Sequence, residues 1–75
     1  MGASEKGTEI KIRLLQINKR QKWLIDEVKS RNQWMDSSYM TRLLNGTEKN
    51  ERLMNVIEEI VSKEEARQEA EHGKG

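Results

Sequence analysis

A short polar segment near the middle of the chain carries the side chains best suited to contact another molecule. At the 3.6-residue period of an α-helix, its hydroxyl and guanidinium groups fall on one side and its apolar groups on the other. The polar set is Ser37, Ser38, Thr41 and Arg42, and the apolar set is Met40, Leu43 and Leu44. Hydroxyl and guanidinium groups bind base edges and phosphate oxygens in DNA. Polar residues also cover the outer face of any surface helix, so this segment alone does not decide between the two interpretations.

Residues that begin and end helices bound this segment. Asp36 is a preferred N-cap because its carboxylate accepts hydrogen bonds from the first free backbone N–H groups. Gly46 readily takes the left-handed conformation that ends a helix. We therefore expect a helix over residues 36–45.

Length and composition argue against most other kinds of site. A chain of 75 residues without cysteine forms one small domain, with little room for an enzymatic cleft and no thiolate metal site. The single histidine, His72, lies in a polar tail without ligand partners at helical spacing. The glutamate pairs at 58–59 and 64–65 diverge on a helix, because adjacent residues are about 100° apart. We expect no enzyme activity, no metal and no cofactor.

The chain also lacks the apolar segments that direct proteins into or across a membrane. No apolar run approaches the roughly 20 residues of a transmembrane helix, and residues 1–9 lack the apolar centre of a secretion signal. We expect a cytoplasmic protein that makes no membrane contact.

Apolar periodicity predicts the elements that must position the polar segment. The absence of proline and the abundance of Leu, Ile, Met, Glu, Lys, Arg and Gln favour an all-α fold. Helices are expected at about 8–18, 19–29 and 36–45, with a fourth capped by Asn50. Their inner positions are Ile10, Leu14 and Ile17, widened by Ile12 and Leu15; then Trp23, Leu24, Ile25 and Val28; and finally Leu53, Val56, Ile57, Ile60 and Val61.

We expect these helices to form a small four-helix orthogonal bundle with frayed termini. Residues 1–7 are predicted to be a disordered N-terminal segment, and residues 8–65 to be the folded domain. The apolar stripe of the fourth helix stops after residue 62. Residues 66–75 are therefore predicted to be a charged flexible tail, with nothing to hold them against the core. The fourth helix either extends into this tail through Ala66 and Ala70 or, as we expect, frays from about Ala66 onward.

Charge is distributed unevenly along the chain, although the total is only +1. Residues 10–50 contain nine Lys or Arg against four Asp or Glu, a net charge of +5. Residues 51–75 contain four basic residues against seven glutamates, a net charge of −3. A polyanion would approach the middle segment, although a solvated lysine-rich face also explains such a run.

The order of these elements resembles the lambda-repressor-like, Xre/Cro type of helix-turn-helix domain. The resemblance covers about residues 10–61, and its most specific part is the segment SYMTRLLNG at 38–46. That segment is similar to the family's recognition helix and the glycine turn after it. The long connection before it is similar to that of small phage-like and mobile-element proteins.

The resemblance implies where the protein would touch DNA. It places Gln21, at the start of the second helix, on the DNA backbone. It places the exposed residues of the third helix on base edges, and we expect further phosphate contacts from nearby cations and a tyrosine. The expected base-reading set is Ser37, Ser38, Thr41 and Arg42, and the expected backbone set is Gln21, Lys22, Arg31, Tyr39 and Lys49.

Three departures from the family pattern stand out. Arg20, a poor cap, stands where a Thr or Ser usually precedes the glutamine, so either Asn18 caps the second helix or its first turn is irregular.

The connection at 30–35 looks about five residues longer than the usual turn. Either the second helix gains a turn through Arg31, or residues 32–33 form a loop that folds Trp34 onto the core. The usual fifth helix, often used for dimerisation, is also missing.

The aromatic residues favour packing roles. In a chain without phenylalanine, Trp23 and Trp34 are the largest core fillers available, so we expect both to pack inside. Tyr39 is expected to pack its ring beneath the start of the third helix while its hydroxyl reaches a phosphate.

The sequence therefore predicts a bacterial or phage-encoded transcriptional regulator that reads the major groove of double-stranded DNA with residues 36–45. The protein is expected to be a monomer in solution and to bind DNA half-sites as two copies. The alternative is a phage-like interaction module that binds a host or repressor protein without reading DNA.

Overall fold

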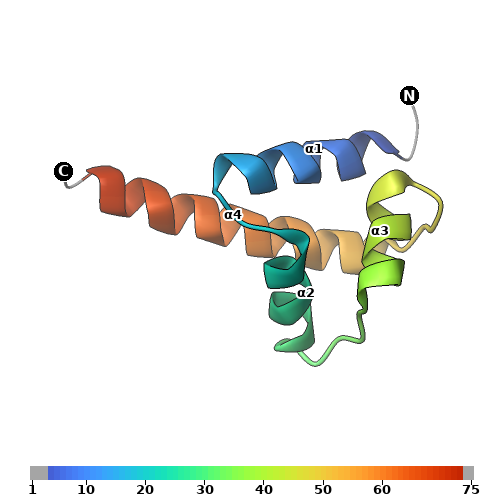
Figure 1. The fold of residues 1–75 in the computed structure, drawn as a ribbon. Helices are drawn as coiled ribbons and strands as arrows, with labels where there is room; N and C mark the ends of the chain where they lie inside the picture. The colour runs from blue at the N-terminus through green and yellow to red at the C-terminus, as the bar shows by residue number, and fades with distance from the viewer. Residues whose placement is uncertain (1–3, 74–75) are drawn as a thin grey trace.

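The computed structural model describes residues 4–73, which form four α-helices without a β-strand among them (Figure 1). They are α1 (Ser4–Gln16), α2 (Gln21–Lys29), α3 (Ser37–Asn45) and α4 (Glu51–Gly73). α1 and α4 run in the same general direction, while α2 and α3 are oriented across that direction (Figure 1). The prediction of a small all-α bundle is confirmed. No helix in the described part of the chain is long and apolar enough to cross a membrane.

One hydrophobic core holds all four helices together. The apolar positions predicted for α3 are buried, as are the central positions of α1 and most of those of α4. Trp23 and Val56 are partly buried and pack against the edge of the core. Two methionines join the core without having been predicted, one in the connection before α3 and one in α4. The buried residues are Ile10, Leu14, Ile17, Leu24, Ile25, Val28, Met35, Met40, Leu43, Leu44, Leu53, Met54, Ile57, Ile60 and Val61.

The apolar stripe of α1 is narrower than predicted. Ile12 and Leu15 were expected to widen it, but they are 49% and 79% exposed. The prediction for these two residues is wrong because the buried side of α1 is the line of Ile10 and Leu14, continued by Ile17 after the helix, and Ile12 and Leu15 lie off that line.

α1 begins earlier than the sequence pattern suggested. Its first turns include Ser4 to Gly7, which we expected to be disordered; residues 1–3 of that predicted segment lie outside the described residues. A Cβ added to Gly7 would lie 1.7 Å from the backbone oxygen of Leu44, so only glycine allows α1 to approach α3 this closely. Gly7 therefore sets the position of α3 relative to α1.

α4 continues well beyond Ala66, where we expected fraying to begin, and ends at Gly73. The last two residues of the predicted tail lie outside the described part of the chain. Beyond the end of the apolar stripe, polar side chains hold α4 against the rest of the molecule. The Gln68 side-chain amide donates a hydrogen bond to the backbone oxygen of Ile17 at 2.9 Å. The prediction that this region cannot contact the core was wrong because it considered apolar contacts alone.

Candidate nucleic-acid interface

α3 is bounded by the two residues that the sequence indicated. The Asp36 carboxylate accepts a hydrogen bond from the backbone N–H of Tyr39 at 2.7 Å, and Gly46 adopts the left-handed conformation with φ 84°. Met40, Leu43 and Leu44 lie in the core. Because both ends and one face of α3 are fixed, the orientation of its outer face is fixed as well.

All four predicted base-reading side chains are exposed on that outer face. Ser37 and Ser38 make no side-chain hydrogen bond within the described residues, whereas the Thr41 hydroxyl donates to the backbone oxygen of Ser37 at 2.9 Å. The Arg42 guanidinium pairs with Glu48 at 3.3 Å and lies 5.7 Å from the centre of the Tyr39 ring. An exposed ion pair of this kind is weak, so Arg42 can exchange its partner for another acceptor.

Tyr39 links α3 to the start of α4. Its ring is partly buried against the core, as predicted, and its hydroxyl accepts a hydrogen bond from the Asn50 side-chain amide at 3.2 Å. A phenol that accepts one hydrogen bond keeps its own hydrogen as a donor. The Asn50 side-chain oxygen accepts from the Leu53 backbone N–H at 3.1 Å, which confirms Asn50 as the cap of α4.

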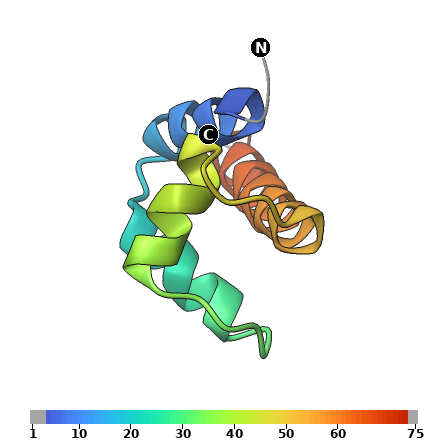
Figure 2. The ribbon, with the colours of Figure 1, turned by 90° about the vertical axis from the view of Figure 1, so that its right-hand side faces the viewer.

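The start of α2 lies on the same side of the molecule as the start of α3 (Figure 2). Gln21 is partly exposed and Lys22 exposed at this end. Arg20 occupies the N-cap position without a side-chain hydrogen bond, as its type suggested. Asn18 does not cap α2, because it adopts a left-handed conformation in the turn after α1 with φ 61°. The free backbone N–H groups in the first turn of α2 therefore lie next to the Gln21 and Lys22 side chains.

Two predicted phosphate-binding cations have different surroundings. Arg31 is occupied within its own segment: its guanidinium donates to the backbone oxygen and the carboxylate of Glu27 at 3.1 and 3.2 Å. Lys49 is exposed beside a groove of about 420 Å³ between α1, α3 and the start of α4. Lys6 also lines this groove, together with Glu48 and Glu51. Its mixed charge favours no particular ligand.

The long connection between α2 and α3 places its two apolar residues on opposite sides. α2 ends at Lys29, and Asn32 turns the chain with a left-handed φ of 61°. The following residues, 33–36, have no regular secondary structure. Met35 is buried, and Trp34 is 65% exposed. The prediction that Trp34 packs in the core is wrong, because the flexible Met35 side chain occupies that place.

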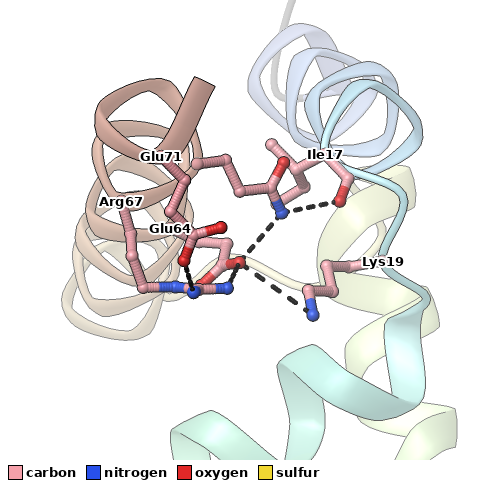
Figure 3. A network of polar contacts seen from close by, with 6 residues as sticks. Ile17, Lys19, Glu64, Arg67 and Glu71 are labelled. Atoms are coloured by element: carbon pink, nitrogen blue, oxygen red, sulfur yellow. Dashed lines mark hydrogen bonds and ion pairs between the residues drawn. The ribbon is translucent and has the colours of Figure 1, made fainter. Parts of the chain in front are cut away.

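The second half of α4 forms a dense polar network with the turn between α1 and α2 (Figure 3). Glu64 of α4 accepts hydrogen bonds from Arg67 and Gln68 and pairs with Lys19 at 3.9 Å. Arg67 also bonds Glu71 at 2.7 Å. The hydrogen bond from Arg67 holds the pKa of Glu64 at about 2, well below its usual 4.5. This network ties α4 to the turn that precedes α2.

A second ion pair joins α1 to the same half of α4. Arg13 donates to both carboxylate oxygens of Glu65, at 2.9 and 2.7 Å, and to the Ser62 hydroxyl at 2.9 Å. The hydrogen bond with Glu65 raises the pKa of Arg13, and the same bond lowers the pKa of Glu65. Such a two-pronged contact fixes the angle between the two helices.

One contact near α3 escaped sequence reasoning. The Lys11 ammonium of α1 donates to the Asn45 side-chain oxygen at 2.6 Å, which ties down the end of α3. These residues are 34 positions apart in the chain, so no local pattern links them.

Within the described residues, no group of His, Cys, Asp or Glu is placed to hold a metal ion.

Comparisons of the chain with models of protein families, with curated proteins and with solved structures found no match. The functional interpretation therefore rests on the arrangement of its own side chains.

Proposed function

We propose that the protein is a sequence-specific DNA-binding regulator of the Xre/Cro helix-turn-helix type, which reads the major groove with α3. The observation that carries this proposal is the outer face of α3, where Ser37, Ser38, Thr41 and Arg42 are all exposed. Short hydroxyl side chains allow close approach to base edges, and a guanidinium recognises guanine through two hydrogen bonds.

The surroundings of α3 contain side chains that would make the expected phosphate contacts. Gln21 and Lys22, on the same side as the start of α3, would grip one strand through side chains and free backbone N–H groups. The Tyr39 hydroxyl, Arg31 and Lys49 would add contacts around the helix. The net charge of +5 over residues 10–50 would attract the duplex from a distance.

We further propose that two copies act together on DNA. A single short recognition helix covers about four or five base pairs and cannot select one site in a genome. Two copies on half-sites about 34–36 Å apart would read enough sequence. We expect the free protein to be a monomer in the cytoplasm of a bacterium, because the fourth helix uses its apolar stripe inside its own core.

A second candidate function is a protein-interaction module on the same scaffold. The specific observation in its favour is the exposure of Trp34, since tryptophan is frequent at the centre of protein interfaces. The two functions differ in the surface used: α3 and the start of α2 for DNA, and the 30–36 connection alone for a protein partner.

A titration with duplex DNA of random sequence at low salt tests the proposal. In a spectrum of the 15N-labelled protein, we expect amide signals of residues 19–49 to shift, while those of residues 62–71 stay in place. Raising the salt concentration should reverse the shifts, because phosphate contacts release counterions. If residues 19–49 do not respond, DNA reading is rejected and the protein-interaction function is preferred.

A further inference from the structure

Trp34 is an exposed aromatic side chain beside the candidate interface, and it has no packing role that explains its type. It is 65% exposed, and its one ring contact in the described structure is with Tyr39, at 5.3 Å between ring centres with the planes tilted by 59°. Its indole N–H makes no hydrogen bond within the described residues. The buried Met35 next to it anchors the connection instead.

Trp34 lies next to Tyr39, which together with Arg42 belongs to the side chains that we propose contact DNA. The Tyr39 ring is close to both the indole of Trp34 and the guanidinium of Arg42, whose carbon is 5.7 Å from the ring centre. Arg42 and Tyr39 lie three residues apart on α3 and therefore share one side of the helix. Trp34 extends that side beyond the first turn of α3, where the DNA backbone flanks an inserted helix.

The charges around Trp34 favour a polyanion over an apolar partner. Residues 29–42 contain the cations Lys29, Arg31 and Arg42 but one acid, Asp36, whose carboxylate caps α3. The guanidinium groups of Arg31 and Arg42 are each paired with one partly exposed glutamate, at 3.2 and 3.3 Å. Such exposed pairs contribute little to stability, so a phosphate can displace them.

We propose that Trp34 binds the sugar–phosphate backbone of the same duplex that α3 reads. The indole N–H donates to a phosphate oxygen, and the ring packs on the adjoining deoxyribose, braced from behind by Tyr39. The long connection between α2 and α3 then serves to carry this tryptophan to the DNA. This inference rests on the proposed function and adds a contact that sequence reasoning assigned to the core.

The first test measures affinity for a fluorescent duplex of random sequence at low salt. Trp34→Ala should weaken binding about tenfold, since it removes a hydrogen bond to a charged group and a packing contact. Trp34→Phe, which keeps a ring but loses the N–H, should fall between the wild type and Trp34→Ala. The dependence of affinity on salt should stay unchanged, because no charge is removed.

Leu15→Ala is the matched control. Leu15 is 79% exposed on α1, outside the candidate interface, so its truncation removes a comparable exposed apolar group. Its affinity for the duplex should stay within about twofold of the wild type, as expected for a surface change outside the interface. Thermal melts of all three variants check that each one folds.

The second test observes the indole directly in the wild-type chain. The protein has two tryptophans, so a 15N spectrum contains two indole N–H signals, and Trp34→Phe identifies which one belongs to Trp34. Adding the duplex should shift the Trp34 signal and slow its exchange with water. The Trp23 signal should change less.

Three outcomes would overturn the inference, and they are distinguishable. If the duplex shifts the α3 amides while the Trp34 indole and the affinity of Trp34→Ala stay unchanged, Trp34 is not a DNA contact although the proposed function stands. If the duplex shifts no amide, both fail. If the Trp34 signal moves with protein concentration in the absence of DNA, a second copy of the chain covers it.

Discussion

The outer face of α3 and the second half of α4 are both polar surfaces, but their side chains are used in opposite ways. On α4, Glu64, Glu65 and Arg67 each bond at least one side chain, and several of these bonds reach α1 or the turn after it. On α3, Ser37 and Ser38 have no side-chain partner within the described residues. These three polar groups on α4 are therefore satisfied inside the molecule, whereas the two serine hydroxyls on α3 are available to another molecule.

This difference separates polar groups that stabilise the fold from polar groups that are free to bind, a distinction that the composition of the chain does not reveal. Both regions follow the same helical period, and both would be read from sequence as solvated faces. A charge held by two or three partners loses freedom to bind elsewhere, because a ligand must first break those bonds. Exposed hydroxyls, by contrast, give up only water when they bind a ligand.

The core that supports both regions gives the largest expected effect. Ile57→Ala should lower the free energy of unfolding by about 2–5 kcal/mol, because it leaves a cavity at the centre of the α4 stripe. Denaturant unfolding monitored by circular dichroism measures the loss. Asn55→Ala, an exposed change on the same helix, should alter stability by at most about 0.5 kcal/mol. A comparable loss in both variants would mean that Ile57 is not a core residue.

Changing Gly7 should disturb α3 more than α4. Gly7→Ala places a methyl group against the Leu44 backbone oxygen, so α1 must move away from α3, at a cost of about 1–3 kcal/mol. Thr8→Ala, at an exposed neighbouring position, is the control. Amide shifts in the variant should concentrate in α1 and α3. Unchanged stability would contradict the close helix approach.

Arg42 and Lys22 test whether the α3 face discriminates sequences. Arg42→Ala should weaken binding to a duplex selected from a random library by about 1–3 kcal/mol and weaken binding to random duplex much less. Lys22→Ala should weaken both alike and reduce the slope of log affinity against log salt by about one, as one lost phosphate contact requires. Equal losses for Arg42→Ala on both duplexes would reassign Arg42 to the DNA backbone.

Low pH should weaken the ion-paired second half of α4 and so lower the stability of the protein. The pKa of Glu64 lies near 2 in the folded protein against a usual 4.5, so its stabilising contribution is complete above about pH 4.5 and is lost as the pH falls toward 2. The Glu64 side chain is 11% exposed but its partner Arg67 is half exposed, so screening limits this contribution to about 1 kcal/mol.

Glu64→Gln removes the titrating group and should flatten this part of the pH profile of the melting temperature. Glu59→Gln, on an exposed carboxylate of the same helix, should leave the profile as in the wild type. Identical profiles for the wild type and Glu64→Gln would show that the network does not stabilise the fold.

Local features of the chain predicted much of this molecule. Asp36, Gly46 and Asn50 act within one turn of their own helix, so their roles as caps and helix end followed from residue type and spacing. The same holds for the inner and outer faces of α3. Contacts between distant segments were not accessible in this way: Lys11 with Asn45, Arg13 with Glu65 and Gln68 with Ile17 each join residues more than 30 positions apart.

The sequence by itself determined that the chain forms four helices, the N-caps of α3 and α4 and the polar face of α3, because backbone hydrogen bonding and side-chain periodicity are local properties. Only the tertiary structure decided which of two adjacent apolar residues, Trp34 or Met35, entered the core, because that choice depends on the shape of the space left between packed helices. It also decided that the charged end of α4 contacts the turn after α1, through Gln68 and Ile17. The need for glycine at position 7 likewise arises only where α1 meets α3. Both depend on neighbours brought together by folding.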